Sequence, residues 1–174
     1  MTKLKYESYS INFQEVPSEI TLGFNISGCP YKCEGCHSPF LWEDIGTPLL
    51  DNIETIIKKY ENLITCVCFF GGDQNKDELL ECLKICKSFN LATCLYSGYG
   101  KGKGHETGVK KELKYFSSFT PYLDYLKTGE YNKELGGLSS PNTNQVFYKV
   151  EHLENKHKLS DITSLFTKKS EVIR

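Results

Sequence analysis

Net charge, long apolar runs and an apolar leader are what this sequence lacks. Its 22 acidic and 21 basic side chains nearly cancel, so no overall electrostatic field attracts the protein to nucleic acid or to an anionic membrane. The longest apolar runs, such as residues 63–70, are far too short to cross a bilayer. Residues 1–6 contain no apolar signal segment. We therefore expect a soluble cytoplasmic protein that binds neither nucleic acid nor membrane.

The eight cysteines fall into two groups. A chain of 174 residues is long enough to bury a core as one domain, residues 1–174, without disulfides. A secreted disulfide scaffold is usually shorter and follows a signal peptide. One Gly/Pro-punctuated loop holds Cys29, Cys33 and Cys36, and apolar segments hold Cys66, Cys68, Cys82, Cys86 and Cys94. We expect the loop cysteines to carry chemistry and the others to pack in the core.

Strand-like and helical segments alternate along the chain. Apolar alternation or β-branched runs predict strands at residues 20–26, 63–70, 91–96, 122–127 and 145–150, and helical spacing of apolar residues predicts helices at 49–60, 76–89 and 109–116. This order predicts an α/β fold with a mostly parallel sheet and right-handed crossovers. Because a closed eight-unit barrel typically takes ~250 residues, we expect a partial, open (β/α) barrel. Its core is residues 20–150, and a polar tail follows.

The turns after four predicted strands carry the polar candidates for a site. They are the cysteine loop, Gly71-Gly72-Asp73, Ser97-Gly98 and Thr128-Gly129. In parallel sheets the strands end at a common edge, and ligands collect there. We expect these four turns to lie together.

The spacing Cys29-x3-Cys33-x2-Cys36 places three thiolates close enough in sequence to hold one metal centre. Structural zinc sites and ordinary electron-transfer clusters use four ligands. Three thiolates therefore favour an iron–sulfur cluster with one iron left open for an exogenous ligand. A zinc site completed by His37 remains an alternative, although neighbouring residues rarely point at the same ion. A distant cysteine as fourth ligand also remains open.

The residues of this loop carry a family resemblance. Residues 28–37 (GCPYKCEGCH) resemble the cluster loop of the radical S-adenosylmethionine superfamily, and within it the activating proteins of anaerobic (class III) ribonucleoside-triphosphate reductase. Further stretches that resemble this family are residues 71–73, 95–99, 125–131 and 140–145. The resemblance covers roughly residues 20–148. Two departures are Gly35, where many superfamily members have an aromatic residue, and Asp73, where many relatives have Glu.

The resemblance implies an activity. A 4Fe–4S cluster on Cys29, Cys33 and Cys36 would bind S-adenosylmethionine through its open iron and cleave it reductively. The products would be methionine and a 5′-deoxyadenosyl radical. The radical would take a hydrogen atom from a backbone glycine of the partner, an anaerobic ribonucleoside-triphosphate reductase. A low-potential donor such as flavodoxin or ferredoxin would supply the electron.

Several residues are candidates for binding the cofactor. Gly71 and Gly72 lack side chains, so their backbone can approach the methionyl end, and Asp73 can add a charge-assisted contact. Gly35 and His37 flank the last cysteine, beside the expected adenosine. Further candidates for the ribose or carboxylate are Ser97, Lys127, Asn144 and Gln145. Each of these four is also compatible with a plain exposed turn residue.

Other readings of the chain remain open. It can be an activase of another glycyl-radical enzyme, a radical enzyme acting on a small molecule, or a non-catalytic zinc- or cluster-binding adaptor. Residues 98–105 resemble a phosphate cradle but lack its lysine-then-serine or -threonine ending, so we expect a mobile loop at a partner interface. His105, His152 and His157 show no ligand spacing, so surface or loop positions account for them.

Overall fold

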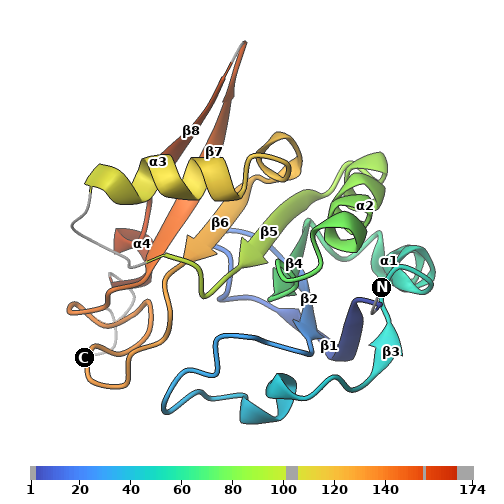
Figure 1. Ribbon diagram of the computed structural model, residues 1–174. Helices are drawn as coiled ribbons and strands as arrows, with labels where there is room; N and C mark the ends of the chain where they lie inside the picture. Colours follow the sequence, from blue (N-terminus) through green and yellow to red (C-terminus); the bar gives the residue numbers. More distant parts are fainter. Residues whose placement is uncertain (1–2, 101–105, 155, 168–174) are drawn as a thin grey trace, which may run out of the picture.

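A mixed eight-stranded sheet forms the centre of the molecule in the computed structural model, which describes residues 3–100, 106–154 and 156–167. The strand order is β3-β1-β2-β4-β5-β6-β7-β8. The strands are β1 (Lys5–Asn12), β2 (Thr21–Ile26), β3 (Thr47–Pro48), β4 (Cys66–Phe70), β5 (Ala92–Tyr96), β6 (Tyr125–Thr128), β7 (Val146–Leu153) and β8 (Lys156–Asp161). The sheet does not close on itself, because β3 and β8 form its two edges (Figure 1).

The sheet is parallel only at its centre. Strands β2, β4, β5 and β6 pair in parallel, whereas β3, β1, β7 and β8 join in antiparallel fashion. The expectation of a mostly parallel sheet is therefore wrong. Short connections favour antiparallel neighbours, and β8 begins only three positions after the last residue of β7. The expected open α/β sheet is confirmed.

The predicted helices are present with shifted ends. They are α1 (Ile53–Tyr60), α2 (Lys76–Ser88) and α3 (Glu106–Tyr115), and they lie on the same side of the sheet (Figure 1). Short 3₁₀ turns, η1 (Pro39–Trp42) and η2 (Thr120–Tyr122), and a last helix, α4 (Ser164–Thr167), complete the described elements. Strands β1, β3 and β8 were not expected, so the tail after residue 150 has more structure than its polar composition indicated. The loop expected at a partner interface, residues 98–105, falls largely on residues 101–105, and these, including His105, lie outside the described residues.

The two faces of the sheet bury different residues. On β4, Val67 and Phe69 belong to the larger core cluster, which α1 and α2 cover, while Cys66 and Cys68 belong to a second cluster on the opposite face. This alternation follows from the two-residue period of a strand. The second cluster also contains Cys94.

The five cysteines outside the loop are buried and form no disulfide bonds. Burial raises the pKa of the Cys66, Cys82, Cys86 and Cys94 thiols. A thiol with a raised pKa is a poor nucleophile and metal ligand. The expectation that these cysteines pack in the core is confirmed.

No helix in the described part of the chain combines the length and the apolar composition needed to cross a membrane.

The phenylalanine at the centre of β4 gives a test of the core. Phe69 is fully buried, so Phe69→Ala is expected to lower the free energy of unfolding by about 3–5 kcal/mol. Phe13→Ala is the matched control, because Phe13 is 66% exposed, and its effect should be small. Urea denaturation followed by circular dichroism measures both. Equal losses of the free energy of unfolding in the two variants would contradict the assignment of Phe69 to the core and of Phe13 to the surface.

Candidate functional site

The four central strands end side by side at one edge of the sheet. The parallel register aligns Asn25 of β2 with Phe70 of β4, then Tyr96 of β5 and Lys127 of β6. The turns after these strands enclose a cavity of about 160 Å³. It is lined by Ile26, Cys29, Pro30, Tyr31, Cys33, Cys36, Ser38, Leu41, Trp42, Phe70, Gly71, Asp73, Gln74, Tyr96, Ser97, Gly98, Lys127 and Tyr131. The structure thus brings the expected turns together.

Backbone hydrogen bonds fix the start of the cysteine loop. The Gly28 amide donates to the Glu43 carbonyl at 3.0 Å, and the Cys29 amide donates to the Leu41 carbonyl at 2.9 Å. The Ser27 hydroxyl donates to the Ile45 carbonyl at 2.6 Å. The chain that returns after η1 therefore lies along the first residues of the loop and determines where Cys29 points.

The three loop thiols share the cavity and are partly exposed. The Ser38 amide donates to the Cys36 sulfur at 3.4 Å and so helps to orient this side chain. Burial raises the pKa of Cys33, and a backbone hydrogen bond from Tyr131 offsets part of this rise. All eight cysteines lie in the described part of the chain, and the other five are buried in the core. The donor set at this edge is therefore three thiols.

The described residues contain no group of three His, Cys, Asp or Glu side chains placed to hold a single metal ion. His37, the rival fourth ligand, is exposed, and its ring lies edge-on to Tyr131 at 5.1 Å between ring centroids. The identification of the loop as a metal centre therefore depends on its donor chemistry and on the comparison reported below.

Lys127 places an ammonium group inside the cavity. Its side chain is buried, and its Nζ donates to the Gly129 carbonyl at 2.7 Å. Burial lowers the pKa of Lys127 to about 8, and the neighbouring cysteines and Asp73 oppose part of that shift. A buried ammonium is costly unless an anion accompanies it. The site is therefore suited to an anionic group.

Asp73 places a carboxylate in the same cavity. Its Oδ2 accepts hydrogen bonds from Tyr31 at 2.9 Å, Ser97 at 2.8 Å and Tyr115 at 3.3 Å. Its Oδ1 is buried and has no hydrogen-bond partner. Buried carboxylate oxygens are normally paired. The free Oδ1 is therefore a ready acceptor for a donor group of a bound ligand.

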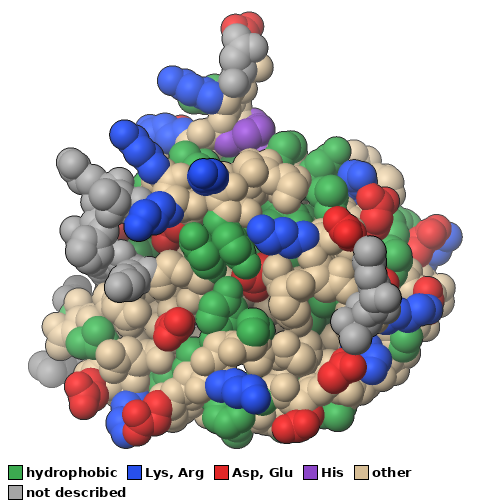
Figure 2. All heavy atoms as spheres, in the orientation of Figure 1, with side chains coloured by type: hydrophobic (Ala, Val, Ile, Leu, Met, Phe, Trp, Pro, Cys, Tyr) green, Lys and Arg blue, Asp and Glu red, His purple; other side chains and the backbone are tan. Residues whose placement is uncertain are grey.

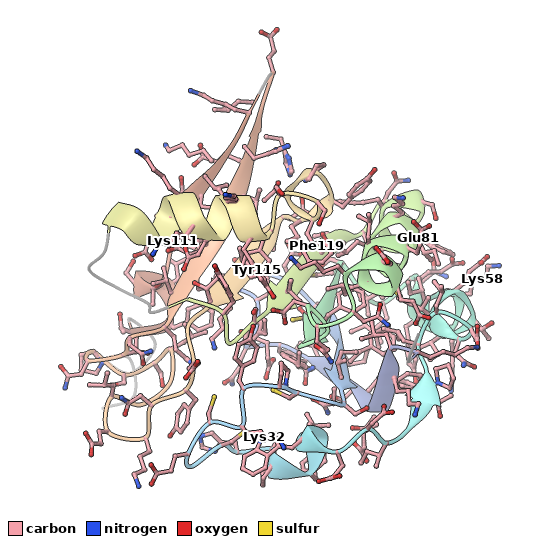
Figure 3. The ribbon with its side chains drawn as sticks, in the orientation of Figure 1. Lys32, Lys58, Glu81, Lys111, Tyr115 and Phe119 are labelled. Carbon is pink, nitrogen blue, oxygen red and sulfur yellow. The ribbon has the colours of Figure 1, made fainter. Side chains whose placement is uncertain are left out.

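Two of the three hydroxyls on Asp73 belong to Tyr31 and Tyr115, which the sequence did not assign to the site. Tyr31 lies between two loop cysteines and packs its ring against Gly98, where an added Cβ would lie 2.6 Å from the ring. Burial raises the pKa of Tyr31, and the adjacent Asp73 raises it further. Tyr115, which is labelled in Figure 3, stacks on Tyr99 with 3.7 Å between ring centroids. No local sequence pattern indicates contacts between residues 42 positions apart.

Backbone conformation gives a second reason for glycine at positions 71 and 72, in addition to the close approach of a ligand to the backbone. Gly71 has φ +101° and Gly72 has φ +112°, in a region that other residues rarely adopt. An added Cβ on Gly71 would meet Ile26 only at an ordinary 3.6 Å. The backbone angle, more than the available space, therefore requires glycine there. The Gly71 amide donates to the Tyr96 carbonyl at 2.9 Å and ties the turn to β5.

The remaining candidates lie around the cavity or behind it. A neighbouring depression of about 670 Å³ shares Cys33 and Tyr131 with the cavity and includes Asn144. The Asn144 amide nitrogen donates to the Glu130 carbonyl at 3.0 Å, and its Oδ1 is buried without a partner. Gln145 is buried and donates to the Gly129 carbonyl at 3.4 Å. It therefore supports the turn that Lys127 also contacts.

Gly35 and His37 lie on the outer side of the loop. Both are exposed, and an added Cβ on Gly35 would lie 3.1 Å from Lys133. Of the nine cofactor candidates, Gly71, Asp73, Ser97 and Lys127 line the cavity, and Asn144 lines the depression. Gly35, His37, Gly72 and Gln145 line neither of these two.

The buried lysine generates a stability test on the protein without any added metal. Lys127→Met is expected to raise the free energy of unfolding by on the order of 1–3 kcal/mol at pH 7, because it removes a desolvated ammonium. The folded pKa is about 8 and the unfolded value is 10.5. The wild-type penalty is therefore complete below pH 8 and disappears as the pH rises towards 10.5.

Urea denaturation of the wild type and of Lys127→Met, each at pH 7 and at pH 10, measures the difference in the free energy of unfolding. The control is Lys149→Met, at an exposed position of the neighbouring β7. A Lys127→Met variant that is less stable at pH 7, or whose gain does not shrink at pH 10, would show that the ammonium is not the destabilising group.

Comparison with known proteins identifies the family. No curated protein matches the chain. The family described as "4Fe-4S single cluster domain" matches residues 20–146, which is more than half of the chain and includes all four turns of the site. The three-thiol loop is a donor set that suits iron–sulfur ligation. The chain therefore belongs to the family of 4Fe-4S single cluster domains.

Proposed function

We propose that this protein is the activating enzyme of an anaerobic ribonucleotide reductase. In this proposal Cys29, Cys33 and Cys36 hold the cluster and S-adenosylmethionine binds in the adjoining cavity. One observation carries the proposal: the three loop cysteines, the buried Lys127 and Asp73, whose Oδ1 has no hydrogen-bond partner, all line the same cavity. An electron-transfer site has no need for a fixed cation and a free anion beside its thiolates.

The chain has groups that suit the two ends of an amino-acid moiety. S-adenosylmethionine carries an ammonium and a carboxylate on its methionyl part. The unpaired Oδ1 of Asp73 can accept from the ammonium, and Lys127 can pair with the carboxylate or with the anionic cluster. When bound and reduced, the cluster supplies the electron that cleaves S-adenosylmethionine to methionine and a 5′-deoxyadenosyl radical. The residues of the chain bind, orient and exclude water.

The Asp73 carboxylate is held before a ligand arrives. Hydroxyls of Tyr31, Ser97 and Tyr115 all reach the same oxygen, Oδ2, and thereby leave Oδ1 as the acceptor. Preorganised groups lower the cost of ordering a site on binding. This arrangement supports Asp73 in the position that relatives fill with Glu.

The architecture supports a partial barrel of the radical S-adenosylmethionine type. Strands β2, β4, β5 and β6 form a parallel core with α1 and α2 as crossovers, and the cysteine loop follows the first of them. The family-like stretch at residues 125–131 forms β6 and the segment after it, which includes Tyr131. The narrower assignment to a reductase activase depends on such stretches and on the open edge at the cavity, which leaves room for a protein substrate.

The radical chemistry is tested by loop variants. After anaerobic reconstitution with iron and sulfide, reduction with S-adenosylmethionine should yield 5′-deoxyadenosine. Cys29→Ala, Cys33→Ala and Cys36→Ala should each abolish the product, because each removes a cluster ligand. Cys68→Ala, in the buried core, is the matched control and should keep the activity. A fully loaded cluster that leaves S-adenosylmethionine intact would favour a non-catalytic adaptor.

The role of Asp73 is tested by charge removal at constant shape. Asp73→Asn should weaken S-adenosylmethionine binding by about 10-fold or more, because a charge-assisted hydrogen bond is lost. Asp77→Asn, in the exposed first turn of α2, is the control. Equilibrium dialysis of the cluster-loaded proteins gives both dissociation constants. Equal affinity in the two variants would remove Asp73 from the cofactor site.

The partner assignment has its own test. Incubation of the reduced enzyme with S-adenosylmethionine and the cognate anaerobic reductase should produce a glycyl-radical signal in electron paramagnetic resonance. Formation of 5′-deoxyadenosine without that signal would refute the reductase as partner. It would then favour another glycyl-radical enzyme or a small-molecule substrate.

A further inference from the structure

We propose that two histidines of the β7–β8 hairpin bind a late first-row divalent cation, such as Ni²⁺ or Zn²⁺, apart from the cysteine loop. His152 of β7 and His157 of β8 are direct cross-strand partners. Their Nδ1 atoms lie 3.1 Å apart, and their ring centroids lie 5.1 Å apart. The hairpin rises away from the sheet beside α3 (Figure 1). Figure 2 shows histidine exposed where it leaves the body of the molecule.

A backbone contact selects the protonation of His152. Its Nε2 lies 3.0 Å from the Leu123 carbonyl oxygen. Because a carbonyl oxygen only accepts, Nε2 carries the hydrogen, and the Nδ1 of the neutral ring carries a lone pair. Metal-binding histidines commonly donate their second ring nitrogen to a backbone carbonyl in this way. His152 is therefore held in the tautomer and orientation of a metal ligand.

The spacing of the two nitrogens suits a tetrahedral ion. With metal–nitrogen distances of about 2.0–2.1 Å, two ligands of a tetrahedron lie roughly 3.3–3.4 Å apart. The observed 3.1 Å differs from this by a few tenths of an ångström. In the metal-free hairpin the His157 Nδ1–H donates to the His152 Nδ1. On metal binding that hydrogen moves to the His157 Nε2, which leaves both Nδ1 lone pairs for the ion.

The neighbouring carboxylate of Glu151 is engaged away from the histidine pair. Glu151 points to the opposite face of the strand, where it accepts from Ser160 and lies 3.8 Å from Lys158. In the described ranges no third His, Cys, Asp or Glu completes a metal-holding group. Water or a donor from another molecule therefore fills the other positions. Imidazole ligands favour Zn²⁺, Cu²⁺ and Ni²⁺ over the harder Mg²⁺ and Ca²⁺.

No local sequence pattern indicates this pair. Histidines five positions apart do not share a face of one helix, and in one strand they point to opposite faces. The antiparallel pairing of β8 with β7 has a register that places the two histidines opposite each other. The spacing of His152 and His157 along the chain therefore indicates no ligand pair, and their proximity follows only from the register of the hairpin.

Titration with nickel tests the proposal. The protein is first loaded with its cluster under anaerobic conditions, so that the loop thiolates are occupied. Isothermal titration with NiCl₂ at pH 7.5 should then show one site per chain. His152→Ala and His157→Ala should each weaken it at least ~10-fold. Lys156→Ala, an exposed position on the same hairpin, is the control and should bind as the wild type does.

Two further readouts separate ligation from a damaged hairpin. His157→Gln keeps a hydrogen-bonding side chain but removes the imidazole, and it should lose nickel affinity while its circular dichroism is unchanged. With Zn²⁺ and ¹⁵N-labelled histidine, the Nδ1 resonances of both residues should shift. Nickel affinity that survives all three histidine substitutions, or that is lost only on substitution of the loop cysteines, would overturn the proposal. Neither result depends on cleavage of S-adenosylmethionine.

Discussion

The parallel pairing of β2, β4, β5 and β6 is the constraint on which the site depends. Parallel strands must all end at the same edge, so the residues that follow them meet there, although they lie up to about a hundred positions apart along the chain. The cysteine loop follows the first of these strands, Asp73 the second, and Ser97 the third, while Lys127 stands near the end of the fourth. The antiparallel margins of the sheet leave this arrangement intact, because they add strands beyond β2 and β6.

Charge inside the cavity gives this edge its chemical character. A buried ammonium, a buried carboxylate with one free oxygen and three thiols share a small volume. Each of these groups costs stability when it lacks a partner. Bound ligands would supply the partners that these groups lack in the ligand-free protein. An anionic cluster beside Lys127 and a ligand ammonium beside Asp73 would satisfy both requirements at once, and this is the physical basis for connecting the iron–sulfur family to S-adenosylmethionine.

The sequence predicts the parts of this account that depend on local pattern. The apolar period located α2 to within one residue and β4 to within three, and the cysteine spacing singled out the loop. The contacts that position the site residues depend instead on residues far apart in the sequence, or on strand register. The reach of Tyr31 and Tyr115 to Asp73 spans 42 positions, and the His152–His157 pair depends on the register of a hairpin. The mixed character of the sheet was missed because β1 and β8 are partly exposed strands with a weak apolar pattern.

The central claim is that the three loop thiolates leave one iron of the cluster open and that the amino-acid end of S-adenosylmethionine binds it. Electron–nuclear double resonance on the reduced, cluster-loaded protein measures this directly, with ¹⁵N in the amino group and ¹⁷O in the carboxylate of the added S-adenosylmethionine. The account predicts strong hyperfine couplings to both labels, as expected for direct ligands of iron. A loaded cluster that shows neither coupling in the presence of saturating S-adenosylmethionine would contradict the account.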